Sequence, residues 1–201
     1  MDFKKHLETG WQNTLKFIGP VILLTFIQVL VSIFSLGILA PVTTAGYMKS
    51  LLLAGREGRT PDVKDLFSEM SLFLPLLGFA FLLVVVIGIG FMFLILPGLI
   101  LAILFLFASL YMLPLMVDRR LGVIDALKGS WEMANRSPIS DQVIITIIYA
   151  AILSIGGSIP FAILVAQPLA TFVILSVYQE RQSASSGMGN VQGAPPPPPV
   201  R

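Results

Sequence analysis

Residues 71–117 read SLFLPLLGFAFLLVVVIGIGFMFLILPGLILAILFLFASLYMLPLMV, and none of these 47 side chains is charged. The core of a bilayer is about 30 Å thick and takes about 20 helical residues to cross, so the stretch is long enough for two spans. Its middle contains Leu96-Pro97-Gly98, where proline cannot continue a helix and glycine frees the backbone to turn. The stretch therefore predicts a hairpin of two transmembrane helices.

The composition of the whole chain points the same way. Of its 201 residues 56% are hydrophobic and 12% are charged, whereas a soluble domain carries about 25% charged residues. The net charge of +2 is too small to indicate a nucleic-acid partner. With no cysteine and a single histidine, His6, the chain offers no disulfide framework, no thiol nucleophile and no cysteine- or histidine-based metal site. We therefore expect no catalytic residue, no metal and no cofactor.

Two further apolar stretches resemble the first in length and interruption. Residues 17–54 are broken near Gly37, and residues 142–178 are broken by the Gly- and Pro-containing stretch 156–160. The sequence thus predicts an all-α polytopic membrane protein with six transmembrane helices in three hairpins. The predicted helices are about 17–36, 38–54, 72–95, 98–117, 141–156 and 160–178. The predicted domains are an amphipathic N-terminal segment (1–16), the transmembrane domain (17–178) and a disordered, proline-rich tail (179–201).

The charged residues indicate the topology. All 24 Asp, Glu, Lys and Arg side chains lie before residue 17, within 49–69, within 118–141 or after residue 178. Positive residues mark the cytoplasmic side of a membrane protein. Because each charged segment is separated from the next by an even number of predicted spans, all of them can be cytoplasmic. We expect a multi-pass membrane protein with both termini in the cytoplasm.

The segment that follows the second hairpin is amphipathic. Apolar residues recur at helical spacing over residues 121–134, with charged residues on the other faces. Tryptophan is favoured at the level of the lipid headgroups, so the segment predicts a helix lying on the inner leaflet. A similar short segment with a tryptophan precedes the first hairpin. The predicted interfacial or partner-binding residues are Trp11, Asp118, Arg119, Arg120, Asp125, Lys128, Trp131 and Glu132.

The same acidic residues could in principle form a catalytic set. Asp125 and Glu132 are seven residues apart and share a helix face, but Lys128 lies between them and can neutralise either carboxylate. No histidine and no metal-ligand spacing accompanies them. The interfacial interpretation is therefore favoured over the catalytic one.

Three residues inside the predicted spans bear on transport. Pro114 and Pro168 should each kink a helix. Broken helices often mark binding sites in transporters, but kinked packing without transport is the favoured interpretation. Lys49 is the one charge inside a predicted span, and near the cytoplasmic end its side chain can reach the headgroups. No carboxylate lies in a predicted span, which disfavours a proton-coupled carrier. Whether helix 38–54 spans fully stays open.

Several short motifs together resemble a known group of proteins. Residues 41–47 read PVTTAGY, 55–58 read GREG and 65–67 read DLF; YMLPLMVD at 111–118 is followed by DALKGSW at 125–131, and YQER at 178–181 follows Pro168. This pattern, over about residues 10–182, resembles six-helix bacterial membrane proteins: the membrane domain of some glycerophosphodiester phosphodiesterases and the YciC (UPF0259) and DUF975 proteins. The resemblance implies a location in the bacterial inner membrane. It supplies no catalytic residues for this chain, because in those phosphodiesterases catalysis belongs to a separate soluble barrel.

The sequence therefore predicts a non-enzymatic integral membrane protein that organises lipids or recruits a partner at the cytoplasmic leaflet. The alternative is a small-solute or lipid transporter or channel. Membrane lipids and a cytosolic or membrane protein are the expected partners, and the oligomeric state stays open. The prolines at 195–199 are expected to form an extended left-handed helix, either as a spacer or as a ligand for an aromatic groove.

Overall fold

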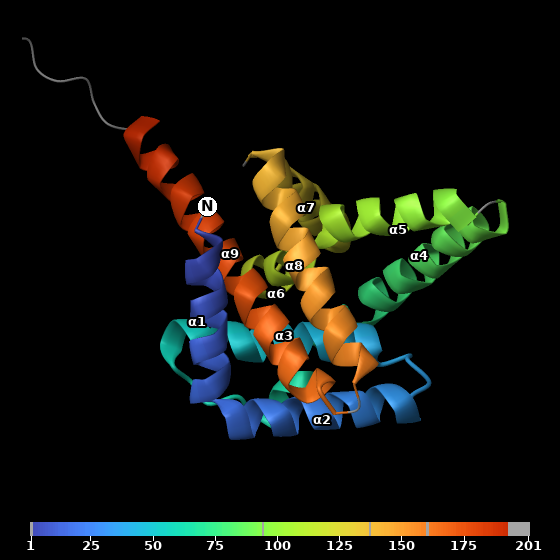
Figure 1. Ribbon diagram of the computed structural model, residues 1–201, viewed down its shortest axis with the longest axis horizontal. Helices are drawn as coiled ribbons and strands as arrows, with labels where there is room; N and C mark the ends of the chain where they lie inside the picture. The colour runs from blue at the N-terminus through green and yellow to red at the C-terminus, as the bar shows by residue number, and fades with distance from the viewer. Residues whose placement is uncertain (1, 94, 137, 160, 193–201) are drawn as a thin grey trace, which may run out of the picture.

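A computed structural model of the chain describes residues 2–93, 95–136, 138–159 and 161–192 (Figure 1). The described residues contain no strand, which confirms the all-α class. In chain order the helical segments are α1 (Phe3–Lys16), α2 (Ile18–Phe34), α3 (Ala40–Glu57), the short 3-10 segments η1 (Val63–Phe67) and η2 (Met70–Leu72), α4 (Phe73–Phe93), α5 (Ile95–Ser109), α6 (Met112–Arg119), α7 (Val123–Arg136), α8 (Ile139–Ser158) and α9 (Ile163–Gln192).

Four helical segments of the described chain are long and apolar enough to cross a membrane. A fifth span results if α1 and α2, which meet at 89°, are counted as one broken span. The α2 helix alone has 17 residues, somewhat fewer than the about 20 needed for a crossing. These findings indicate a multi-pass membrane protein, whereas six spans in three hairpins stay a prediction. The four segments are Val63–Met92, Gly98–Arg119, Ile139–Ser158 and Ile163–Ala184.

The α3 helix lies at the centre of the bundle. It packs against α2, α4, α6, α9 and η1, and it buries ten of its residues. A Cβ added to Gly46 would lie 2.4 Å from the backbone oxygens of Asp65 and Leu66, so α3 and η1 approach backbone to backbone. Tyr47 is 1% exposed, and its hydroxyl is 3.0 Å from that of Thr25. The polar residues of α3 therefore face protein rather than lipid.

Glycine and proline set the breaks between helices. The turn between α2 and α3 contains Gly37 at φ +83°, a conformation that glycine adopts without a Cβ penalty, which confirms the predicted break. The α5 helix begins at Ile95, so Pro97 lies in its first turn, where the missing N–H is not needed. A Cβ on Gly98 would lie 2.8 Å from the Phe91 nitrogen, which shows how closely α5 passes the end of α4.

The two prolines inside predicted spans have different positions in the second half of the bundle. The predicted helix 98–117 divides into α5 and α6, and the break precedes Pro114, which lies in the first turn of α6 and interrupts no helix. The α9 helix continues through Pro168, whose ring removes the N–H that would bond the Leu164 carbonyl.

The predicted boundary of the tail also differs from the structure. The α9 helix continues past Tyr178 to Gln192. Residues 179–192, predicted to be disordered, are therefore helical. The proline stretch at 195–199 lies outside the described residues.

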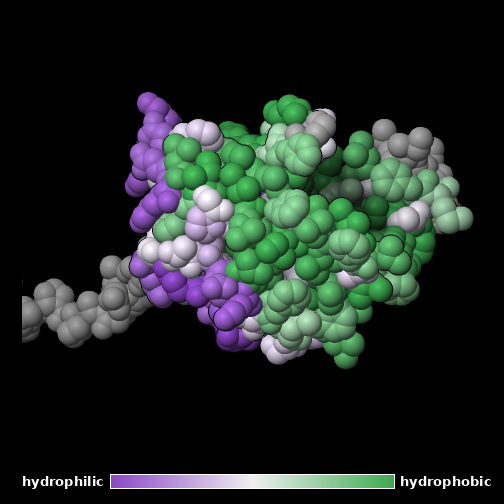
Figure 2. Space-filling model, turned by 90° about the horizontal axis from the view of Figure 1, so that it is seen from below, coloured by the Kyte–Doolittle hydropathy of each residue, from purple (hydrophilic) through white to green (hydrophobic). Residues whose placement is uncertain are grey.

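Polar and apolar surfaces separate along the molecule. Figure 2 shows hydrophilic residues gathered at one end, while hydrophobic residues cover most of the remaining face. In Figure 1 the hairpin of α4 and α5 reaches away from the other helices, and only 6% of the most apolar window of the α4 segment is buried. Its exposed residues include Leu74, Phe81, Val84 and Met92. An apolar surface of this kind suits lipid, and a polar end suits the membrane–water boundary.

Candidate membrane-surface site

Asp118 joins three helices near the polar end. Its Oδ2 accepts hydrogen bonds from Arg56 Nη2 of α3 at 2.9 Å, and from the Tyr178 hydroxyl at 2.8 Å and Gln182 Nε2 at 3.0 Å of α9. The Asp118 side chain is 13% exposed. The sequence places Asp118 on an interfacial surface, but the structure shows a carboxylate that holds α3, α6 and α9 together.

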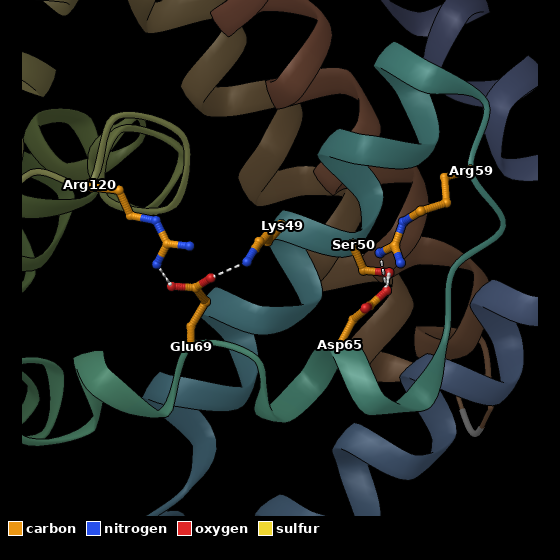
Figure 3. A network of polar contacts seen from close by, with 6 residues as sticks. All are labelled: Lys49, Ser50, Arg59, Asp65, Glu69 and Arg120. Atoms are coloured by element: carbon orange, nitrogen blue, oxygen red, sulfur yellow. Dashed lines mark hydrogen bonds and ion pairs between the residues drawn. The ribbon is translucent and has the colours of Figure 1, made fainter.

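Glu69 forms a second buried junction, drawn in Figure 3. Its side chain is 0% exposed and lies between two cations, Lys49 Nζ at 2.6 Å and Arg120 Nη1 at 2.7 Å. Beside it, Asp65 accepts a hydrogen bond from Ser50 Oγ at 2.6 Å and pairs with Arg59. Removing one partner from a buried ion pair is strongly destabilising, so this junction supports the contact of α3 and α6 with the segment between η1 and η2.

Lys49 is therefore not the snorkelling lysine that the sequence predicts. Its side chain is 25% exposed and ends on the Glu69 carboxylate, within the protein. The nearby Arg120 keeps 59% of its side chain exposed while it pairs with the same carboxylate. Neither residue is an isolated charge in an apolar span, so neither marks a transport path by itself.

Arg181 joins α6, α7, α8 and α9 from a position predicted to lie in the tail. Its guanidinium stacks over the Tyr111 ring at 4.9 Å, and Nη1 donates to the Met133 carbonyl at 2.9 Å and to Gln142 Oε1 at 2.7 Å. The Tyr111 hydroxyl donates to the same Gln142 oxygen at 3.0 Å, and the Tyr111 N–H donates to Ser130 Oγ at 3.1 Å. Arg181 thus stabilises the end of the bundle.

The α1 helix lies across the start of α2 and packs on α9. The contact face is small and polar: a Cβ on Gly10 would lie 2.6 Å from Val173 Cγ2, and His6 Nδ1 is 2.8 Å from Ser176 Oγ. A second face presents an apolar stripe to the outside, Leu7, Trp11 and Leu15, with exposed fractions of 36%, 48% and 47%. Lys4, Lys5, Glu8 and Lys16 occupy the remaining surface. This arrangement is typical of a helix lying in the membrane interface.

His6 is buried between α1 and α9, beside a serine and an acidic residue of α9. It is 2% exposed, and its Nε2 lies 3.1 Å from Glu180 Oε2 at an angle that makes no hydrogen bond. Burial lowers the pKa of His6, and the neighbouring Glu180 carboxylate opposes this shift. The contacts of His6 with Ser176 and Glu180 lie in the interface between α1 and α9, which touch directly at Gly10.

The α7 helix divides the predicted apolar stripe between two sides. Leu121, just before the helix, and Leu127 pack against the core, and Ala134 is fully buried. Ile124 and Trp131 instead point outward, with exposed fractions of 70% and 45%. The Trp131 ring meets Phe107 of α5 edge to face, with centroids 6.2 Å apart. Arg119, Asp125, Lys128 and Glu132 are also exposed, so most of the predicted interfacial set does lie at the surface.

The sequence names Asp118, Arg120 and Lys49, but it did not single out the other junction residues, among them Arg56, Glu69, Tyr178, Arg181 and Gln182. Arg56, Tyr178 and Arg181 fall in the quoted motifs, which was a usable signal, whereas Glu69 has none. Among the residues that the structure describes, no group of three His, Cys, Asp or Glu side chains could hold a metal ion.

Comparison of the chain with protein-family models, curated proteins and solved structures finds no match. The resemblance to the YciC and DUF975 proteins and to the phosphodiesterase membrane domain therefore stays a prediction.

Proposed function

We propose that this protein is a non-enzymatic membrane scaffold that organises lipids at the cytoplasmic leaflet through α1 and α7. The observation that carries the proposal is the exposure of Trp11 and Trp131, 48% and 45%, each on a helix with exposed charged residues. An indole ring is favoured at the headgroup level because the ring is apolar and its N–H can donate a hydrogen bond to water.

The proposed topology has six spans in three hairpins, with both termini in the cytoplasm of a bacterial cell. Its support is that α2 packs on α3, α4 on α5 and α8 on α9, while Arg56, Asp118 and Gln182 meet at one end. In this arrangement α3 is a central span whose polar groups find partners in the protein. The α1 helix, at 89° to α2, then lies in the membrane plane.

The hydrogen bonds at depth favour a scaffold over a transporter. Gln28 Nε2 donates to Thr44 Oγ1 at 3.0 Å, and Gln167 Nε2 donates to Gln28 Oε1 at 2.8 Å. These hydrogen bonds connect α2, α3 and α9. The side chains that form them bond to one another, whereas the polar groups of a solute path would face water. With Lys49 also paired, the polar groups near the centre of the bundle support packing.

The two tryptophans allow a direct test, since the chain contains no others. Trp11→Phe leaves Trp131 as the single reporter, and Trp131→Phe leaves Trp11. In vesicles that contain lipids brominated at defined depths, both reporters should be quenched most by the shallowest bromines and weakly by aqueous acrylamide. Strong acrylamide quenching with no bromine quenching of either reporter would overturn the proposal.

A further inference from the structure

The outer side of α7 carries a hollow that the interfacial role alone does not explain. Its volume is about 390 Å³, and it is lined by Trp131, Glu132, Asn135 and Arg136. It is open to the outside, so a group held there keeps contact with water. The lining combines one aromatic ring, one carboxylate, one amide and one guanidinium, and therefore has no net charge.

The ion pair inside the hollow is weak and can be replaced by a ligand. Arg136 Nη2 lies 3.8 Å from Glu132 Oε2, and their side chains are 65% and 66% exposed. Exposed pairs of this kind contribute little, so separating them to admit a zwitterion has a small free-energy cost. The Trp131 ring is held in place by its contact with Phe107.

An apolar path leads from the hollow along α5. Phe107, Leu104 and Ile100 are spaced three and four residues apart and share one face of the helix. Leu104 and Ile100 are 51% and 57% exposed. An acyl chain lying along this face would bring its headgroup to Trp131, so the position favours a membrane lipid over a soluble ligand.

We propose that this hollow binds the headgroup of an amine-bearing zwitterionic phospholipid, with the ammonium at Glu132 and Trp131 and the phosphate at Arg136. The inference rests on the proposed lipid-organising function. A primary ammonium donates hydrogen bonds to the carboxylate while it lies over the indole face, and the guanidinium suits the phosphate oxygens. A quaternary ammonium has no N–H and is held by a cage of several rings, whereas this hollow offers one. An anionic headgroup could pair its phosphate with Arg136, but it carries no ammonium and would leave the Glu132 carboxylate without a counter-charge.

The test is competition for the purified full-length protein between phosphatidylethanolamine, phosphatidylcholine and phosphatidylglycerol with identical acyl chains, read by native mass spectrometry. An exposed ammonium–carboxylate pair gives up to about a fivefold preference, so phosphatidylethanolamine should be retained about three- to fivefold over phosphatidylcholine. Glu132→Gln should abolish that preference, and Arg136→Gln should weaken retention of both lipids. Asp125→Asn and Lys128→Gln change charges of the same helix outside the hollow and should retain the wild-type preference.

Three results would overturn the inference: equal retention of the two zwitterionic lipids, a preference that survives in Glu132→Gln, or preferential retention of phosphatidylglycerol. Each is compatible with shallow bromine quenching of Trp131, so the headgroup site can fail while the scaffold proposal holds. Both substituted side chains are about two thirds exposed, and unchanged melting temperatures of the variants would confirm that the lipid data report binding.

Discussion

Replacing Glu69 by glutamine removes the carboxylate that holds Lys49 and Arg120 together. Breaking a buried ion pair by removing one partner typically costs about 3–5 kcal/mol. Here the stranded groups are cations whose side chains are 25% and 59% exposed, so water solvates them in part and we expect the low end, about 3 kcal/mol. For a chain of about this length 1 kcal/mol corresponds to about 2–4 °C, so the melting temperature in detergent should fall by about 6–12 °C.

A double-mutant cycle separates the interaction between Lys49 and Glu69 from the effect that each substitution has by itself. Lys49→Gln should lower the melting temperature less than Glu69→Gln does, because Arg120 still pairs with the buried carboxylate. The double variant should be more stable than the sum of the two single effects implies, by about 1 kcal/mol, since groups in contact couple by about 0.5–3 kcal/mol.

The exposed Lys64 of η1 supplies the matched control, and Lys64→Gln should leave the melting temperature unchanged. If Lys49→Gln behaves like Lys64→Gln, or if the cycle is additive, Lys49 reaches the headgroups as the sequence suggested and our account of the Glu69 junction is wrong.

Three other perturbations test contacts elsewhere. Gly46→Ala should lower the free energy of unfolding by about 1–3 kcal/mol or more because its Cβ meets backbone oxygens, whereas Gly78→Ala, with nothing within 4 Å, should be neutral or stabilising in thermal unfolding. Arg181→Lys should cost about 1–3 kcal/mol by the same assay, because an ammonium cannot reproduce the stacking on Tyr111 together with the two hydrogen bonds of Nη1, and equal stability would argue against the junction. Burial lowers the pKa of His6 below 6.5, so the stability that neutral His6 contributes is present above pH 6.5 and is lost as the pH falls through the folded-state pKa. The hydrogen-exchange protection factors of α1, which are corrected for the intrinsic pH dependence of exchange, should therefore fall on acidification in the wild type and change less in His6→Gln.

The apolar helices could be predicted because their signal is local. A run of 47 uncharged residues has to be buried in lipid or in protein, and Gly37 marks a turn by its own backbone chemistry. Residues 96–98, predicted as a turn, instead lie in the first turn of α5. The exposed tryptophans of α1 and α7 likewise follow from the amphipathic pattern of each segment. These features depend on the local sequence and need no contact with a distant segment.

The junctions could not be predicted because their partners are distant in the chain. Arg181 lies in a polar segment, which composition alone marks as a tail, yet it bonds the carbonyl of Met133, 48 residues earlier. Lys49 has a partner in Glu69, which lies in a segment with no helical pattern of its own. From the sequence alone, a charged residue inside an apolar helix is assumed to face lipid, because its counter-charge on another segment is not known.

The orientation of α1 and α7 at the inner leaflet is the central claim, and cysteine labelling of intact cells tests it most directly. The native chain has no cysteine, so a single Cys in place of Gln12, Lys128, Ile38 or Ser158 is the only thiol, and all four positions are exposed. We predict that an impermeant thiol reagent labels Ile38→Cys and Ser158→Cys, at the turns after α2 and α8, from outside the cell. Gln12→Cys and Lys128→Cys should react only after the membrane is opened. Labelling of Lys128→Cys in intact cells would contradict the account.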